Sequence, residues 1–193
     1  MSTTLWNPKP VRFLEGERIY LRPVGQEDAE GYFRMLFNPE MRRLTGTRQA
    51  LTLEGIRRYI DGKTGDASTV LLLIALRDSD EVIGDIALQD IDPANRNANI
   101  RIAIDSEEHL GKGFGPESMR LLLEYGFGIL NLHRIELQVF GYNVRAIKAY
   151  EKVGFKREGV QRDALYYNHR YHDSVIMSML EDEFRALYHQ QAE

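Results

Sequence analysis

The sequence predicts one α+β domain, and three observations support this fold class. Three strand-like segments with short connections occupy the middle of the chain, and such connections are typical of antiparallel strands. Two amphipathic helices alternate with further strands in the second half. The 193 residues are enough for one well-buried domain and few for two, and the sequence contains no repeat, linker or low-complexity stretch.

Composition excludes several classes of protein. No apolar run approaches the roughly 20 residues that a membrane-spanning helix needs, and the N-terminus lacks the apolar core of a signal peptide. The chain has no cysteine, so disulfides and thiolate catalysis are impossible, which fits a cytoplasmic protein. Acidic and basic residues are interleaved and the net charge is −4, so a concentrated basic surface for nucleic acid is not indicated. We expect neither a membrane nor a nucleic-acid partner.

The first half of the chain is expected to form a strand, two helices and three more strands. Residues 18–24 have strand composition. A helix over 27–37 begins with acidic residues at the positive end of its dipole, and Asn38-Pro39 ends it. A second helix is expected over 52–60. The three further strands are predicted at 69–77, 81–91 and 97–104, the first two as a hairpin.

The second half is expected to alternate helices and strands. Apolar residues recur at helical spacing over 116–130, with Pro116 at a permitted early position. A second amphipathic helix over 143–153 ends at Gly154. Strands are expected at 133–140, 155–160 and 171–180, and a helical tail from residue 181. The domain is expected to span 13–185, with an irregular lead-in over 1–12 and a C-terminal tail over 186–193.

A glycine-rich loop between a strand and a long helix is the sharpest local feature, and it reads Leu110, Gly111, Lys112, Gly113, Phe114, Gly115. Glycines there let the backbone turn tightly and bring N–H groups near an anion, and the helix N-terminus adds partial positive charge. A P-loop is excluded because Gly113 follows Lys112 where Ser or Thr is required. The dinucleotide fingerprint fails because Pro116 takes the place of its last glycine. A glycine turn that merely starts a helix stays open as an alternative.

A second candidate site lies on the helix over 143–153. Asn143, Ala146, Ile147 and Tyr150 are spaced so that they share one face. Asn143 suits a helix N-cap, and its amide is also suited to contact a ligand. The alternative is that Tyr150 is a core aromatic residue and Asn143 only a cap.

Together these segments resemble the GNAT superfamily of N-acetyltransferases over about residues 13–180. The resemblance rests on the order of a strand, the loop LGKGFG, a long helix, HRIELQV and NVRAxxxYEKVGF. In the loop pattern R/Q-x-x-G-x-G/A of that superfamily, Gly113 and Gly115 match, while Leu110 takes the Arg or Gln position. The segments ERIYLRPV and YHDSVIMSML are similar to ribosomal-protein N-terminal acetyltransferases, and LEYGFGILNLHRIELQV with NHRYHDSV is similar to spermidine acetyltransferases.

The resemblance implies a GNAT fold: a mixed, largely antiparallel sheet of about seven strands, flanked by helices, with two splayed parallel strands at 97–104 and 133–140. It implies acetyl-CoA as co-substrate, no metal, an amine substrate and a homodimer. The site that it implies has four parts: Leu110, Gly111, Lys112, Gly113, Phe114 and Gly115 hold the pyrophosphate, backbone groups near Ile102 and Ile104 pair with pantetheine, Asn143 and Ala146 contact the cofactor, and Tyr150 protonates the leaving thiolate.

The acceptor amine is less well defined. Relatives often carry Glu where this chain has Asn99, so a base candidate is missing. Presenting a neutral lysine-like amine at pH 7 costs about 4.6 kcal/mol, against about 1.4 kcal/mol for an α-amine. This difference slightly favours a protein N-terminal α-amine as the acceptor, acetylated by direct attack through a tetrahedral intermediate. The alternatives are a small-molecule amine, such as a polyamine, aminoglycoside or amino sugar, and a sensor that binds acyl-CoA without turnover.

Three aspartates and two histidines complete the candidates. Asp85, Asp90 and Asp92 are placed where they could act as a base through water, although each taken singly is interpreted as a solvated strand-edge or turn residue. His169 and His172 lie on opposite faces of a strand-like segment without a third ligand, so a metal site is not predicted.

Overall fold

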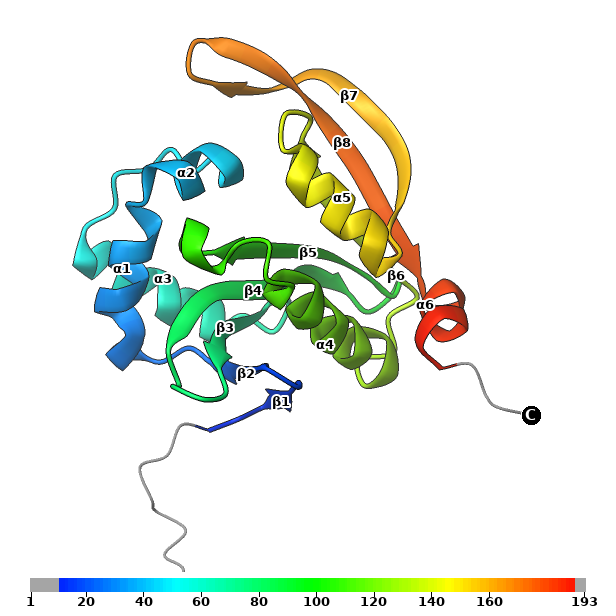
Figure 1. The fold of residues 1–193 in the computed structure, drawn as a ribbon, viewed down its shortest axis with the longest axis horizontal. Coiled ribbons are helices and arrows are strands. Elements are labelled where there is room, and N and C mark those ends of the chain that lie inside the picture. Colours follow the sequence, from blue (N-terminus) through cyan, green and yellow to red (C-terminus); the bar gives the residue numbers. More distant parts are fainter. Residues whose placement is uncertain (1–10, 190–193) are drawn as a thin grey trace, which may run out of the picture.

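The computed structural model describes residues 11–189, which form one eight-stranded sheet flanked by helices (Figure 1). The strand order is β1-β2-β3-β4-β5-β6-β8-β7, and every neighbouring pair is antiparallel except β5 with β6. The strands are β1 (Leu14–Glu15), β2 (Ile19–Pro23), β3 (Val70–Leu76), β4 (Val82–Asp92), β5 (Asn97–Ile104), β6 (Arg134–Phe140), β7 (Lys156–Tyr167) and β8 (Arg170–Leu180). The helices are α1 (Ala29–Leu36), α2 (Pro39–Thr45), α3 (Leu53–Thr64), α4 (Phe114–Gly128), α5 (Val144–Val153) and α6 (Glu181–Tyr188). The predicted α+β class with one parallel strand pair is confirmed.

Several boundaries differ from the sequence prediction. Asn38-Pro39 was expected to end a helix, but it also begins α2: the Asn38 side chain accepts from the Glu40 and Met41 N–H groups, and proline occupies the first helical position. The short β1 raises the strand count from about seven to eight. β7 continues to Tyr167, well beyond the expected 155–160, because it pairs with β8 along its length. Most of the expected lead-in lies outside the described residues, and the expected tail, of which residues 190–193 also lie outside them, begins within α6.

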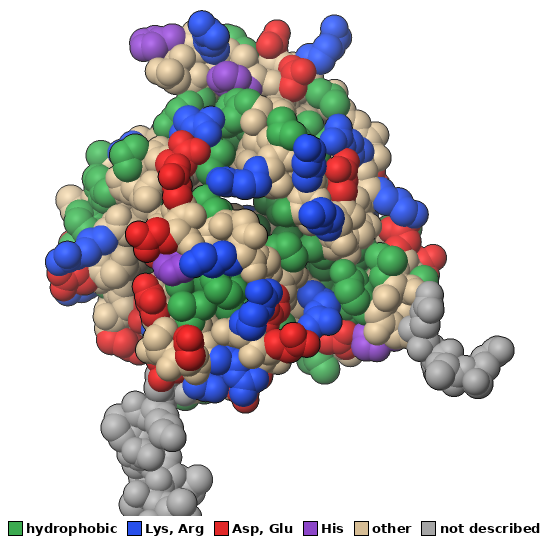
Figure 2. Space-filling view, viewed as in Figure 1, with side chains coloured by type: hydrophobic (Ala, Val, Ile, Leu, Met, Phe, Trp, Pro, Cys, Tyr) green, Lys and Arg blue, Asp and Glu red, His purple; other side chains and the backbone are tan. Residues whose placement is uncertain are grey.

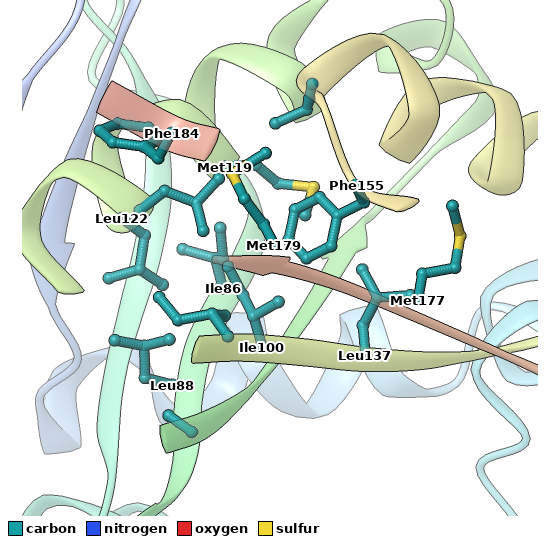
Figure 3. Close-up of a cluster of buried hydrophobic side chains, with 14 of the residues drawn as sticks. Ile86, Leu88, Ile100, Met119, Leu122, Leu137, Phe155, Met177, Met179 and Phe184 are labelled. Carbon is teal, nitrogen blue, oxygen red and sulfur yellow. The ribbon is translucent and has the colours of Figure 1, made fainter. Parts of the chain in front are cut away.

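Helices cover both faces of the sheet, and each face has its own core. On one face α4 and α6 pack against the strands, and Figure 3 shows Met119 and Leu122 of α4 and Phe184 of α6 above Ile86 and Ile100. The other face is covered by α1 and α3, which bury Ala29, Tyr32, Ile56 and Ile60 against Leu71, Leu73 and Ala87. The central strands are therefore covered on both faces, whereas most residues of β7 are exposed.

β5 and β6 pair over a very short distance. Their parallel register covers Asn97, Ala98 and Asn99 opposite Arg134, Ile135 and Glu136, and then stops. β6 continues along β8 to Phe140, and β5 continues along β4 to Ile104. The two strands therefore diverge and leave a gap in the middle of the sheet, as the expected splayed pair requires.

Among the described residues, a helix with the length and apolar character of a membrane span is not found.

We predict that Gly84→Ala destabilises the fold, because β4 and β5 approach closely at this position. A methyl group on Gly84 would overlap the carbonyl oxygen of Ala103. Overpacking against backbone cannot be relieved by a rotamer change, so a loss of about 1–3 kcal/mol is expected in the free energy of unfolding from urea titration. The control is Gly31→Ala on the exposed side of α1, where an added methyl meets nothing within 4 Å. Equal stability of the two variants would contradict this account.

Candidate active site

A cleft of about 1280 Å³ passes through the gap between β5 and β6. Backbone geometry explains why strand β5 presents polar groups there. The Asp105 N–H donates to the Ile83 carbonyl on the β4 edge at 2.9 Å, and the Arg96 carbonyl accepts from Arg134 on the β6 edge at 3.2 Å. Backbone groups alternate between the two edges of a strand, so those of Ile102 and Ile104 face β6, beyond the last paired residue. These groups are open to a ligand that lies in the gap.

The cleft has two sides, one on each face of the sheet. We call the first the loop side: it is lined by Ile102, Ile104, Leu110, Gly111, Gly113, Phe114, Gly115, Asn143, Ala146 and Tyr150. The second, the Arg101 side, is lined by residues that include Tyr32, Tyr59, Asp85, Asn99 and Arg101. Every site residue expected from the sequence lines the loop side except Lys112.

The glycine loop is an anion-binding concavity by its geometry. Gly111 and Gly113 have left-handed backbones with φ of 74° and 87°, which glycine adopts without strain. Helix α4 begins at Phe114, two residues earlier than expected, so Phe114 and Gly115 form its first turn. Within residues 11–189, none of the five N–H groups of residues 111–115 donates a hydrogen bond. Five free donors at a helix N-terminus suit a bound phosphate.

Arg18 and Glu117 fix the shape of this loop, and the sequence analysis missed both. The Arg18 guanidinium donates to the Lys112 carbonyl at 2.7 Å and to Glu117 at 2.9 Å, while the Arg18 N–H also donates to Glu117 at 2.9 Å. Burial opposes ionisation of Glu117, but the bonds from Arg18 and Ile19 prevail and lower the pKa of this carboxyl. Lys112, whose carbonyl Arg18 binds, is exposed and does not line the cleft.

Tyr150 lies on α5, on the opposite wall of the loop side. Asn143 caps this helix, since its side-chain oxygen accepts from the Ala146 N–H at 3.2 Å. Burial raises the pKa of Tyr150 to about 12, and no described residue hydrogen-bonds its hydroxyl. The side chain is half-buried, packs against the core and also lines the cleft. A protonated phenol facing a cleft can serve as a proton donor.

Asp85 is not the solvated strand residue that the sequence analysis described. Its side chain is 1% exposed, and it receives Arg101 Nη2 at 2.6 Å and the Tyr32 hydroxyl at 3.0 Å. Burial disfavours the charge on Arg101, but Asp85, Tyr32 and Tyr59 outweigh it and raise the pKa of Arg101 above its usual value. Burial, followed by the Asp85 charge, also raises the pKa of Tyr32. The Asp85 carboxylate is thus engaged in an ion pair and is poorly placed to accept a proton from substrate.

The other acidic and histidine candidates have simpler surroundings. Asp92 caps a turn, where it accepts from Ala94 and Asn95, and these bonds lower its pKa. Asp90 is exposed and lines the cleft. His172 lies 3.2 Å from the Tyr167 carbonyl in the β7–β8 hairpin. Over the described range no group of three or more potential metal ligands is found.

Comparison with known proteins agrees with this geometry. Residues 18–156 match the family model described as an acetyltransferase (GNAT) domain. An uncharacterised N-acetyltransferase of Bacillus licheniformis, p20, is 30% identical over 171 residues, which are 87% of this chain and 96% of that protein. A Bacillus subtilis protein provisionally named a ribosomal N-acetyltransferase, YdaF, is 37% identical over 103 residues, 53% of this chain and 56% of its own.

A solved structure gives the most informative likeness. The spermidine N-acetyltransferase of Vibrio cholerae, in complex with CoA and spermine, superposes with a TM-score of 0.82 and 26% identity, covering 88% of this chain and 99% of that chain. The matched family model spans well over half of the sequence. The chain therefore belongs to the GNAT family of acetyl-CoA-dependent N-acetyltransferases.

Proposed function

We propose that this protein acetylates the primary amine of a small molecule, with acetyl-CoA on the loop side and the amine on the Arg101 side. One observation carries the proposal: free backbone donors of the glycine loop and the Tyr150 hydroxyl line the same cleft, which opens through the sheet to the opposite face. The solved spermidine acetyltransferase supports a small-molecule acceptor over the protein N-terminal amine that the sequence analysis favoured.

The loop side fits acetyl-CoA, which supplies an activated thioester when bound. The N–H groups of residues 111–115 donate to the pyrophosphate oxygens, and free backbone groups near Ile102 and Ile104 pair with the pantetheine amides. Asn143 and Ala146 contact this arm from α5. Leu110 contributes only its side chain, because its own N–H donates to the Glu107 carbonyl at 3.2 Å. This distribution explains how the loop functions without the usual Arg or Gln.

Acetyl transfer requires three contributions from the protein. It must hold a neutral amine near the thioester, stabilise the oxyanion of the tetrahedral intermediate, and protonate the departing thiolate. Tyr150 suits the last step because its pKa of about 12 keeps it protonated until the thiolate appears. The unpaired edge of β5 near Ile102 and Ile104 can supply a backbone N–H for the oxyanion. With Asp85 held by Arg101, deprotonation of the amine falls to water or to the exposed Asp90.

The proposal is tested by titrating the protein with CoA and by measuring thiol release from acetyl-CoA with a panel of amines and N-terminal peptides. Release with small amines and little with peptides is expected. A preference for peptides would instead support a protein N-terminal amine as the acceptor. CoA binding without release on any amine would instead identify a sensor, and absence of CoA binding would refute the whole assignment.

Tyr150→Phe is expected to lower kcat by roughly 10²-fold or more, the usual contribution of a general acid, while the KM for acetyl-CoA stays nearly unchanged. The fold should survive, since no described residue hydrogen-bonds the hydroxyl. Because the pKa of Tyr150 is about 12, wild-type kcat should not decline between pH 7 and 10 through loss of this proton. Unchanged turnover in the variant would remove Tyr150 from the mechanism.

Gly113→Ala is expected to weaken CoA binding about tenfold, measured by calorimetric titration. Alanine is strained at a φ of 87°, and its methyl group would lie 3.0 Å from Arg18 Nη2, which holds the loop. Gly159→Ala in β7 is the matched control, because an added methyl there meets nothing within 4 Å. Wild-type affinity in both variants would show that the loop conformation does not govern binding.

A further inference from the structure

Arg101 presents hydrogen-bond donors that acetyl transfer itself does not require. Its side chain is 31% exposed, lines the cleft and immediately precedes Ile102 on β5. All its polar contacts pass through Nη2: Asp85 at 2.6 Å, the Tyr32 hydroxyl at 3.3 Å and the Tyr59 hydroxyl at 3.2 Å. Neither Nε nor Nη1 donates to any residue between 11 and 189. The N–H groups of Nε and Nη1 therefore have no described protein partner and can donate to a ligand.

Tyr59 adds a further donor beside Arg101. Its hydroxyl accepts from Arg101 Nη2, and its own proton has no acceptor in the described part of the chain. The ring stacks on Tyr32, with centroids 6.0 Å apart and an interplanar angle of 23°. Asp85 and the two tyrosines thus hold Arg101 in one orientation, so its free N–H groups are pre-organised.

The cleft offers a polycation few carboxylates. Among the described residues that line it, only Asp85 and Asp90 are acidic, and Asp85 is already neutralised by Arg101. This leaves one carboxylate for a substrate with several ammonium groups. The other cationic residues of the lining, Arg145, Lys148 and Lys152, lie on α5 and belong to the loop side, and Figure 2 shows Lys and Arg side chains around the hollow in this face of the molecule. An anionic group matches the free donors better, because the planar fork of arginine fits a carboxylate.

We propose that the acceptor carries a carboxylate, and that Arg101 and Tyr59 bind this group while the amine reaches the thioester beside Ile102. Asp85 and Tyr32 position Arg101. This inference rests on the proposed function and narrows its substrate class to amino carboxylates. It separates the protein from the spermidine N-acetyltransferase that it resembles in fold.

The test compares matched amines on the wild-type protein by thiol release. 4-Aminobutanoate is set against 1-aminobutane, 1,4-diaminobutane and spermidine, and β-alanine and 5-aminopentanoate against their alkylamine counterparts. For at least one chain length, the carboxylate is expected to have a kcat/KM at least about tenfold above that of its counterpart. Acetylation without this preference, or with spermidine preferred, would overturn the inference and leave the proposed function standing. No release on any amine would instead refute the proposed function.

Two variants test whether Arg101 and Tyr59 cause the preference for the carboxylate-containing amine. Arg101→Lys keeps a cation beside Asp85 but loses the fork, and Tyr59→Phe removes one donor. In each, the ratio of kcat/KM for the carboxylate to that for the alkylamine is expected to fall, about tenfold for Arg101→Lys. Arg34→Lys, on the exposed surface of α1, is the control and should leave the ratio unchanged. A lower melting temperature with an unchanged ratio would show that Arg101 is only structural and overturn the inference.

Discussion

The site depends on the point at which β5 and β6 cease to pair. After three residue pairs each strand keeps a partner on its outer edge and loses the one between them. Unpaired backbone groups at such a gap are costly unless water or a ligand satisfies them. The interruption therefore creates both the space for a ligand and a polar edge that an amide-containing chain can complete.

Two ion pairs hold the walls of this gap, one on each face of the sheet. Arg18 with Glu117 ties the residue before β2 to the first turn of α4, and Arg101 with Asp85 ties β5 to β4 under α1 and α3. Burying charge offers little net stability, because desolvation offsets much of the attraction. Its effect here is geometric: each pair orients backbone or side-chain donors towards the cleft.

Much of the fold and the loop side could be predicted from local patterns. The period of α4, the glycine loop and the shared face of Asn143, Ala146 and Tyr150 each involve residues close in sequence. The Arg18–Glu117 contact joins residues 99 positions apart, so a local sequence pattern does not predict it. Asp85 did carry a signal, since it is a single carboxylate within the apolar run VIGDIAL, where burial requires a partner. The start of α2 was missed because an Asn-Pro pair can end one helix and begin another.

The pairing of Asp85 with Arg101 also constrains how this protein can diverge. Loss of Arg101 alone would strand the Asp85 carboxylate in the interior, at a cost of about 3–5 kcal/mol, a large share of the stability of an ordinary domain, and loss of Asp85 alone would release the contact that orients Arg101. Replacement of both by neutral residues would avoid that cost. Changes at these two positions are therefore expected to arrive together in a lineage, and descendants that recognise a different acceptor should differ at both.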